Sequence, residues 1–391
     1  MRGSPPPADC RITHDNWDRA PFNRWSFQHV REVLPTVPVR RGGGPVRAFQ
    51  RAEQDLNALS FEIADGRGVT LSEFLDETYT DGFIVLHRGA VVFERYFNDM
   101  AADTPHLSQS VGKSIAGTVA GILIGRGVLD PNAPVEEHVP EFAECGYRGA
   151  TLAQVMDMRS GVKFSEVYTD PDSDIGKVDI ASGWKPRRDP SDPEHMFEVI
   201  LGLEQERDHG GRFEYRSIET DVMAFCMERA TGKRLAELVG TELWSRLGME
   251  EDAYFTVDPA GYALADGGFN ATLRDYARFG QMHLDRGAAG GVQIVPQDWV
   301  EACSRGDPSV FGAPYTDVLP NGAYAQQFWV EDADTRAYMA RGVFGQLIHI
   351  DPDSDMVTVK LSTWPDFQNT EFGVNTLRAI HAIARELNSG A

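Results

Sequence analysis

The chain has 391 residues, 42% of them hydrophobic and 25% charged, which is typical of a globular protein with room for about two domains. Its 37 Lys and Arg against 59 Asp and Glu give a formal net charge of −22, which argues against nucleic acid and anionic membranes as partners. No apolar stretch is long enough to cross a membrane, and the N-terminus lacks the apolar core of a secretory signal, so a cytoplasmic protein is expected.

The first third of the chain predicts an arm, a hairpin and a helix. Residues 1–45 are rich in Pro, Arg and Gly and predict an N-terminal arm with a loop at 40–45, and Trp17, Trp25 and Phe27 indicate that part of this arm packs onto the body. The apolar pattern at 83–97, interrupted by Arg88-Gly89, predicts a β-hairpin with its turn at that dipeptide. An apolar helix is expected over 114–124, because glycines that can end a helix follow it.

The middle third predicts short helices joined by long loops. Helical spacing of apolar residues indicates helices over 151–158, 219–231 and 273–284. Residues 164–193 are polar, rich in Asp and Pro, and predict no regular element. A loop of that length is typical of a functional or a disordered segment.

The last third turns to strands. Strands are expected at 328–330, 337–343, 347–350 and 356–361, before a closing helix at about 370–387. The order hairpin, helix, helical block, strands, helix predicts an α+β fold, in which an antiparallel sheet flanked by helices carries a mostly helical insertion. We expect an α/β domain with the N-terminal arm from residues 1–130 and 281–391, and a helical domain from residues 131–280.

Ser110 and Lys113 are the strongest candidates for catalysis. They stand three residues apart where a loop enters the apolar helix, so both side chains share one face and the amine can reach the hydroxyl. A serine becomes a nucleophile only beside a base, and burial lowers the pKa of a lysine so that it can be that base. The spacing is common by chance, so other motifs must support it.

Tyr215 and Gly342 supply that support. Tyr215 begins a Tyr-x-Ser motif between a glycine turn and a predicted helix, and a phenol beside a lysine ammonium has a lowered pKa and can pass a proton. Gly342 lies on a predicted strand, where a glycine marks a close backbone approach or only relieves crowding. Backbone N–H groups of such a strand can hold an oxyanion.

With these motifs the chain resembles the serine β-lactamase and penicillin-binding-protein superfamily, in its class C-like esterase and amidase branch, over about residues 80–385. It looks most similar to the 6-aminohexanoate-dimer (nylon oligomer) hydrolases. The resemblance rests on Ser110-x-x-Lys113, Tyr215-x-Ser217, Gly342-Val343, Ser182-Gly183-Trp184 and Ser362-Thr363-Trp364-Pro365.

The resemblance implies a β-lactamase-like fold and an acyl-serine hydrolase that cleaves amide bonds of short linear oligomers. Ser110 would be the nucleophile, and Lys113 and Tyr215 would move its proton. The N–H groups of Ser110 and Val343 would hold the oxyanion. The residues expected to contact substrate are Tyr168, Trp184, Asp266 and Gly342. Asp179 is a further loop carboxylate that either meets a cationic amine or is only a solvated charge.

The chain departs from the family's motifs at two places, so alternatives to amide hydrolysis are kept. The family's Lys-Thr-Gly is here Ala340-Arg341-Gly342, which argues against turnover of β-lactams and cell-wall peptides. In the lactamases and peptidases of the family that lysine and threonine hold the substrate carboxylate. Arg341 could partly replace the lysine, but strand residues alternate between faces, so the sequence does not fix which way Arg341 points. Ser217 replaces the family's asparagine. The alternatives are a carboxylesterase acting on short-chain esters, a β-lactamase or D-Ala-D-Ala peptidase, and a non-catalytic binding module.

No metal or organic cofactor is expected. The four cysteines form no Cys-x-x-Cys pair and the ten histidines do not cluster. The expected partner is a small amide or ester substrate. The sequence is compatible with a homodimer and does not determine the oligomeric state.

Overall fold

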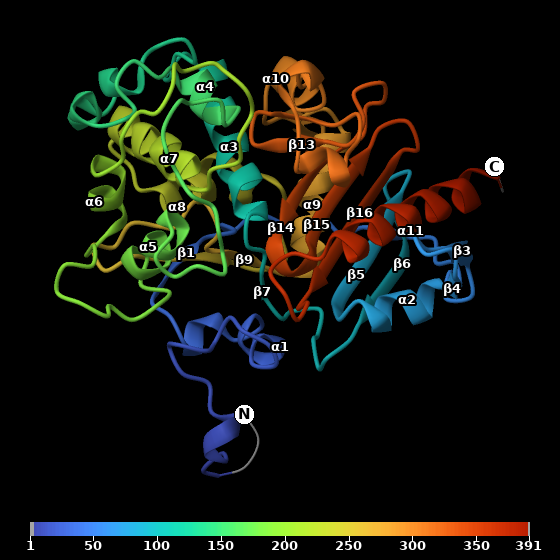
Figure 1. Cartoon of the computed structure of the whole chain (residues 1–391). Helices are drawn as coiled ribbons and strands as arrows, with labels where there is room; N and C mark the ends of the chain where they lie inside the picture. Colours follow the sequence, from blue (N-terminus) through green and yellow to red (C-terminus); the bar gives the residue numbers. More distant parts are fainter. Residues whose placement is uncertain (1–3, 390–391) are drawn as a thin grey trace.

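The computed structural model describes residues 4–389 and is built on an eight-stranded sheet with the order β12-β13-β14-β15-β16-β5-β6-β2 (Figure 1). The neighbouring strands run antiparallel, except for the edge pair β2 and β6, which is parallel. The strands of this sheet are β2 (Gln50–Arg51), β5 (Thr80–His87), β6 (Ala90–Tyr96), β12 (Ala323–Ala325), β13 (Phe328–Val330), β14 (Tyr338–Gly342), β15 (Gln346–Asp351) and β16 (Met356–Ser362).

The α-helices lie on both faces of this sheet and in a block beside it (Figure 1). They are α1 (Asn23–Ser26), α2 (Leu71–Glu77), α3 (Val111–Gly125), α4 (Leu152–Met156), α5 (Asp174–Ala181), α6 (Met196–Leu201), α7 (Ile218–Thr231), α8 (Leu235–Leu238), α9 (Leu273–Leu284), α10 (Gln297–Ala302) and α11 (Thr370–Ser389).

A second sheet of four strands has the order β1-β8-β9-β7, and two small two-stranded sheets complete the fold. The N-terminal arm thus joins the body, because β1 pairs with β8. These strands are β1 (Thr36–Val39), β7 (His106–Leu107), β8 (Ala253–Thr256), β9 (Phe269–Ala271), β3 (Ser60–Glu62), β4 (Gly68–Thr70), β10 (Ala288–Ala289) and β11 (Val292–Gln293).

The large sheet separates two apolar cores, because successive strand residues point to opposite faces. On β5, Ile84 and Leu86 join the core that contains α3 and α9, whereas Phe83 and Val85 join the core beneath α11. The same alternation continues along β14, where Met339 faces the α11 side. The side chain two residues further on, Arg341, therefore belongs to the α11 face.

Helix α3 runs through the centre of the molecule, and its residues are buried from Val111 to Leu123. Its glycines allow this packing: a β-carbon on Gly121 would lie 2.3 Å from the Trp299 ring. The helix connects the sheet to the helical block of α4–α8 and presents its N-terminus between them (Figure 1).

The predicted α+β fold with a helix-flanked sheet is confirmed, and the hairpin turn lies at Arg88-Gly89 as expected. One expectation is wrong. The segment 164–193 contains α5, which Ser173 caps by accepting a hydrogen bond from the Gly176 N–H. Ile175 and Val178 are buried on one side of that helix among polar neighbours, and the short amphipathic pattern was hidden by the surrounding Asp and Pro residues.

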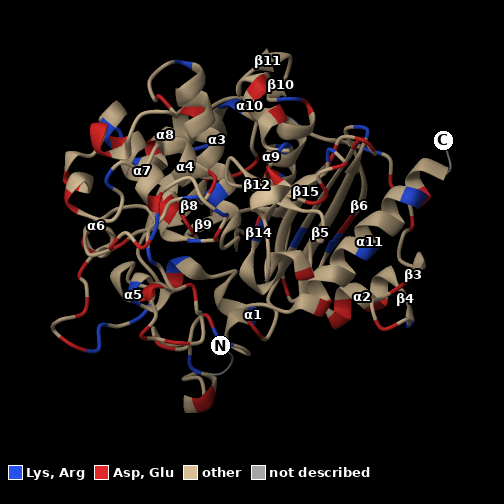
Figure 2. Cartoon of the chain, turned by 45° about the horizontal axis from the view of Figure 1, so that its top comes forward, with Lys and Arg blue, Asp and Glu red and all other residues tan. Residues whose placement is uncertain are grey.

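No helix within residues 4–389 is long and apolar enough to cross a membrane. The charged residues are spread over helices and loops, with both signs on the same elements (Figure 2). The excess of acidic residues therefore does not gather on one face in this view.

Candidate active site

Ser110 stands where the chain turns into α3. The residue before it, Gln109, adopts a left-handed backbone with φ 51°, and the helix begins at Val111. Gly112 lets this first turn lie against the neighbouring loop, because a β-carbon there would lie 3.2 Å from the Ala265 carbonyl oxygen. The serine is thus placed at a helix N-terminus, where backbone N–H groups are free of helical partners.

Lys113 reaches both Ser110 and the opposite loop. Its Nζ lies 2.9 Å from the Ser110 Oγ and 2.5 Å from the carbonyl oxygen of Asp266, to both of which it donates. The side chain is 1% exposed. The expected proximity of the two side chains follows from their positions on one turn of α3.

Tyr215 closes the group from the other side. Its hydroxyl is close enough to Ser110 and Lys113 for both side chains to act on its pKa, and the Lys113 Nζ lies 5.3 Å from its ring centre. The ring stacks on Trp329 at 5.3 Å with an interplanar angle of 26°, and the Tyr215 N–H donates to the Tyr315 hydroxyl at 2.9 Å. The structure therefore brings Ser110, Lys113 and Tyr215 together.

The two proton carriers hold their protons at rest. Burial alone would lower the pKa of Lys113, but its electrostatic interactions with Tyr215 and with the carboxyl groups of Asp266 and Glu166 raise it. Burial raises the pKa of Tyr215, and the nearby lysine only partly offsets this. The expected lowering of both pKa values is wrong. For Lys113 the electrostatic effect of its neighbours, which raises the pKa, is larger than the effect of burial, which lowers it. For Tyr215 the effect of burial, which raises the pKa, is larger than the effect of the Lys113 ammonium, which lowers it.

Glu166 is a buried carboxyl group that binds two residues of the site, and no sequence motif pointed to it. It accepts hydrogen bonds from the Ser217 N–H at 3.0 Å and the Ser217 Oγ at 2.5 Å. It also accepts from the Tyr168 hydroxyl at 2.7 Å. The serine of the Tyr-x-Ser motif thus anchors a buried carboxyl group rather than facing the nucleophile, and Glu166 is one of the carboxyl groups that raise the pKa of Lys113.

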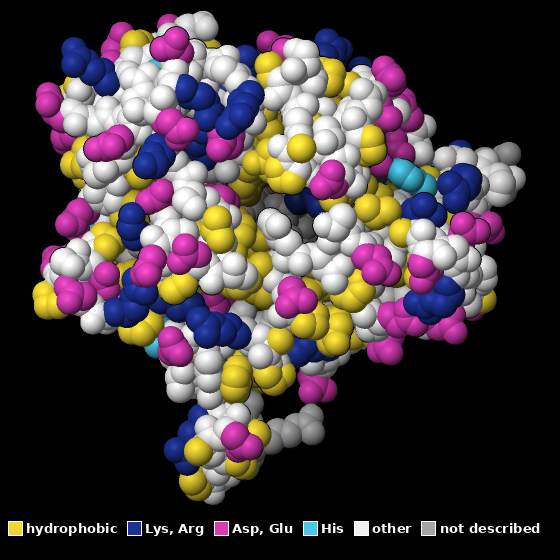
Figure 3. Space-filling view, viewed as in Figure 1, with side chains coloured by type: hydrophobic (Ala, Val, Ile, Leu, Met, Phe, Trp, Pro, Cys, Tyr) yellow, Lys and Arg dark blue, Asp and Glu magenta, His cyan; other side chains and the backbone are white. Residues whose placement is uncertain are grey.

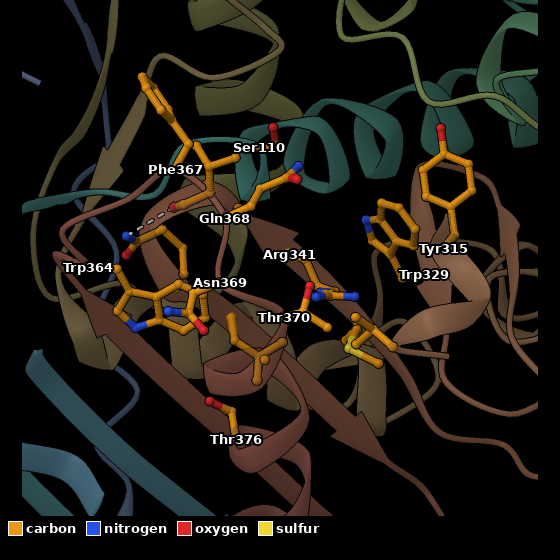
Figure 4. A pocket seen from close by; sticks show the side chains of 18 of the residues that line it. Ser110, Tyr315, Trp329, Arg341, Trp364, Phe367, Gln368, Asn369, Thr370 and Thr376 are labelled. Carbon is orange, nitrogen blue, oxygen red and sulfur yellow. Dashed lines mark hydrogen bonds between the residues drawn. The ribbon is translucent and has the colours of Figure 1, made fainter. Parts of the chain in front are cut away.

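A cavity of about 250 Å³ opens from Ser110 toward α11. Figure 3 shows the hollow near the centre of this face, with a Lys or Arg side chain inside it. Aromatic rings of Tyr215, Tyr315, Trp329, Trp364 and Phe367 form much of its wall. Figure 4 shows Ser110 on one side of Arg341, with Trp329 and Tyr315 on one flank and Trp364 on the other.

Gly342 and Val343 also line this cavity. Strand β14 ends at Gly342, one residue before the predicted end, and Val343 begins a short 3₁₀ turn in which Phe344 has φ 61°. Gly342 lies against the loop before the nucleophile, because a β-carbon on it would come 2.4 Å from the Ser108 carbonyl oxygen. The backbones of Ser110 and Val343 thus border the same space.

Tyr168 and Asp179 line a second cavity of about 350 Å³, beyond Phe367. Tyr168 and Phe367 border both cavities and stack on each other at 5.5 Å. The pKa of Asp179 is raised well above its usual value, mainly by burial and secondly by the charge of Asp18. Asp179 therefore lies in a built recess, not on a solvated loop.

Trp184 and Asp266 are not among the residues that line either cavity. The Trp184 indole donates to the Thr256 Oγ1 at 3.0 Å and packs edge-on against Trp17 at 5.1 Å. Asp266 contacts Lys113 through its carbonyl oxygen. This geometry favours a supporting position for both residues, behind the lysine rather than against a substrate.

Trp329 was not singled out by the sequence, and the direction of the Arg341 side chain was left open. Trp329 carries the Tyr215 ring, and the guanidinium carbon of Arg341 lies 5.4 Å from the Trp329 ring centre. The sequence pattern that could have located both side chains is the alternation between the two faces of the sheet along β13 and β14. This pattern shows that they share a face only when the register between the two strands is known. Within residues 4–389 no group of three or more His, Cys, Asp or Glu is arranged to hold a metal ion.

A family model described as beta-lactamase matches residues 71–383. The chain belongs to the beta-lactamase family. A 6-aminohexanoate-dimer hydrolase of Paenarthrobacter ureafaciens is 40% identical over 358 residues, which cover 90% of this chain and 88% of that protein.

Two solved structures share the fold of this chain. A Bacillus anthracis protein provisionally named 6-aminohexanoate-dimer hydrolase superposes with a TM-score of 0.90 at 29% identity, covering 98% of this chain and 99% of that one. A family VIII carboxylesterase superposes with a TM-score of 0.62 at 18% identity, covering 81% and 95% of the two chains. The second likeness shows the beta-lactamase-like fold alone.

Proposed function

We propose that this beta-lactamase family protein is a serine hydrolase that cleaves the amide bonds of short linear ω-amino acid oligomers through an acyl-serine intermediate. The observation that carries the proposal is the contact of Ser110, Lys113 and Tyr215 at the mouth of an aromatic cavity. The 40% identical relative named for the 6-aminohexanoate dimer supports the substrate class.

The reaction begins when the Lys113–Tyr215 pair accepts the Ser110 proton. The pair is a base only after it has lost one proton from its resting form, because that form is an ammonium beside a neutral phenol. The Ser110 Oγ then bonds to the amide carbon, and the N–H groups of Ser110 and Val343 hold the oxyanion.

Tyr215 completes the acylation. Its hydroxyl gives a proton to the amide nitrogen, the C–N bond breaks, and the amine leaves through the cavity lined by Trp329. In the second half the pair takes a proton from water, the hydroxide attacks the ester carbon, and the proton returns to the Ser110 Oγ as the acid is released. Both halves use the same three side chains.

Asp179 supports an acyl unit with a cationic end. Within residues 4–389 its carboxylate accepts no hydrogen bond and forms no ion pair, whereas the neighbouring Asp18 is paired with Lys185. Its cavity adjoins the Ser110 cavity at Tyr168 and Phe367. An acyl chain that extends from Ser110 past these rings would bring a terminal ammonium to Asp179, and the ammonium would stabilise the ionised form of this buried carboxyl group.

The test compares the linear 6-aminohexanoate dimer with p-nitrophenyl butyrate, using the protein and its Ser110→Ala variant. We expect cleavage of both substrates and a loss of several orders of magnitude in the variant. Near-normal activity of Ser110→Ala would overturn the serine mechanism. A Ser110 that a fluorophosphonate does not label would favour the non-catalytic binding module.

A carboxylesterase is the second candidate, because the mainly aromatic wall of the Ser110 cavity also fits short neutral esters. Fast cleavage of p-nitrophenyl butyrate without cleavage of the dimer would favour it. Turnover of nitrocefin would favour a β-lactamase. The cytoplasmic location and a role in nylon oligomer degradation belong to the same proposal, and cell fractionation tests the first.

A further inference from the structure

Asp221 is a buried acidic residue on α7 that the proposed reaction does not use. It is 3% exposed and lies on the first turn of this helix, which follows Tyr215 along the chain. The Asp221 Oδ1 accepts a hydrogen bond from the Ala265 N–H at 2.9 Å. The N–H of Asp266 is close enough to act on the pKa of the same carboxyl group. Helix α7 therefore holds the backbone of the loop between β8 and β9.

This loop, residues 264–268, is fixed to β8 at both of its ends. The Leu264 N–H donates to the Thr256 carbonyl oxygen at 3.0 Å, and the Thr256 N–H donates to the Gly268 carbonyl oxygen at 2.9 Å. Within residues 4–389, Asp221 is the side chain that accepts from a backbone N–H between these ends. The middle of the loop is thus held by α7 and not by the sheet.

The middle of the loop is also where Lys113 bonds. The Lys113 Nζ donates to the Asp266 carbonyl oxygen at 2.5 Å and to the Ser110 Oγ at 2.9 Å. The carbonyl takes one of the three donors of the ammonium and so helps to set its direction toward Ser110. Helix α7 packs against α3, which carries the lysine (Figure 1). Hydrogen bonds therefore lead from Asp221 through the loop to Lys113.

The second oxygen of Asp221 distinguishes this contact from ordinary packing. Within residues 4–389 the buried Oδ2 accepts no hydrogen bond. Burial, followed by the Asp266 carboxyl group, raises the pKa of Asp221 well above its usual value, whereas Lys113 lowers it. An unpaired buried oxygen costs free energy, and buried groups with shifted pKa values are typical of functional sites. The contact to the loop needs only the other oxygen.

We propose that Asp221 is a positioning residue, which accepts the Ala265 N–H and so holds the Asp266 carbonyl where it directs the Lys113 amine at Ser110. The inference rests on the proposed serine mechanism and adds to it a residue that does not touch the substrate. Helix α7 then fixes both proton carriers, because Tyr215 lies just before its first turn.

The experiment measures how fast a fluorophosphonate labels Ser110 as a function of pH. The reagent reacts with the serine itself, so the result does not depend on whether the substrate is an amide or an ester. Asp221→Ala removes the acceptor, and we expect labelling at high pH to slow by about 10-fold to 100-fold. The loss stays below the full range of general base catalysis, about 100-fold to 10,000-fold, because the base is displaced and not removed.

The pH profile separates positioning from a loss of stability. The Asp266 carbonyl stabilises the Lys113 ammonium, so its displacement should lower the pKa of Lys113. The substitution does not remove the other groups that act on this pKa, which are Tyr215, Glu166 and the Asp266 carboxyl group. The ascending limb of the Asp221→Ala profile should therefore move to lower pH by about 0.5 to 1 unit, although the limiting rate falls. A general loss of stability lowers the rate without moving the limb.

Asp221→Asn tests the hydrogen bond directly. Asparagine keeps a carbonyl oxygen of the same shape for the Ala265 N–H, so the labelling rate and the limb should stay close to those of the unmodified protein. Circular dichroism measures folding. Asp221→Leu, which fills the same space without an acceptor, takes the place of Asp221→Ala if the alanine protein does not fold, and the same slowing is expected.

Asp157→Ala is the matched control. Its Oδ1 accepts one backbone N–H, that of Gln326, also at 2.9 Å, and this contact lies at the end of α4 away from Lys113. The variant should lower Tm and leave the labelling rate and the limb unchanged. Normal labelling of Asp221→Ala, or an Asp221→Asn protein as slow as Asp221→Ala, would overturn the positioning role.

Failure of the proposed function gives a different result. If the unmodified protein is not labelled, the serine mechanism is wrong and the role of Asp221 falls with it. If Ser110 is labelled equally in the unmodified and Asp221→Ala proteins, only the role of Asp221 is rejected. Labelling that depends on Asp221 in a protein that does not cleave the 6-aminohexanoate dimer supports the role and rejects the proposed substrate.

Discussion

Gly342 and Ser108 are in direct backbone contact, so that a β-carbon on Gly342 would lie 2.4 Å from the Ser108 carbonyl oxygen. This contact sets the distance between the end of β14 and the loop that carries Ser110. The strand and the nucleophile loop can border the proposed oxyanion site together only if the residue at 342 has no side chain.

Gly342→Ala should therefore impair catalysis more than folding. The two backbones must separate, which displaces the Val343 N–H from the site and costs about 1–3 kcal/mol of stability. We expect kcat/KM to fall at least about 100-fold, the size of losing one oxyanion donor. Gly43→Ala is the control, since no atom lies within 4 Å of its β-carbon position. Unchanged kcat/KM in Gly342→Ala would reject the role of this contact.

The activity should rise with pH above neutrality. The reactive form of the Lys113–Tyr215 pair has lost one proton, and the pKa of each group is raised by its surroundings. The fraction of enzyme in that form therefore increases as pH rises toward the raised pKa of the pair. A pH profile of kcat/KM for p-nitrophenyl butyrate should have an ascending alkaline limb. A maximum at pH 5–6 would contradict the assigned resting state.

Tyr215→Phe isolates the hydroxyl from the ring. The phenylalanine keeps the stack on Trp329 but removes the group that lies close to Ser110 and Lys113. We expect kcat to fall by about 100-fold to 10,000-fold, the range of general acid–base catalysis, with little change in Tm. Full activity of a well-folded Tyr215→Phe protein would remove Tyr215 from the proton path.

The Ser-x-x-Lys spacing was sufficient to predict that Ser110 and Lys113 meet, because both lie on one turn of a helix. Their protonation was not predictable, since Glu166 and Asp266 come from distant loops. The direction of Arg341 needed the register of β14, and α5 was obscured by its polar neighbours. A contact between residues close in sequence can thus be predicted from their spacing, whereas a pKa set by charged residues that only the fold brings together cannot.

Asp179→Asn should weaken binding of substrates with a terminal ammonium. The change keeps the size of the side chain and removes the carboxyl group that ionises against an ammonium, so KM for the linear dimer should rise by about 10-fold or more, while a neutral ester is less affected. Steady-state kinetics with both substrates measure this. Asp103→Asn, at an exposed position, is the control. A parallel change for dimer and ester would indicate a structural effect instead.

His381 should stabilise α11 in a pH-dependent way. It bonds to Glu331 at 2.6 Å, and this hydrogen bond raises the pKa of the imidazole. A raised folded-state pKa gives stability that is complete below the unfolded pKa of about 6.5 and is lost as pH rises through the folded pKa. His381→Gln should therefore lower Tm at pH 6 and change it little at pH 9. An equal loss at both pH values would contradict this linkage.

The burial of α3 has a consequence for how the protein loses activity. The helix that holds the nucleophile also forms the centre of the hydrophobic core, so Ser110 and Lys113 cannot be displaced while the interior remains packed. Heat inactivation and the collapse of near-ultraviolet circular dichroism should then follow a single curve, and amide protons of this helix should exchange only through global opening.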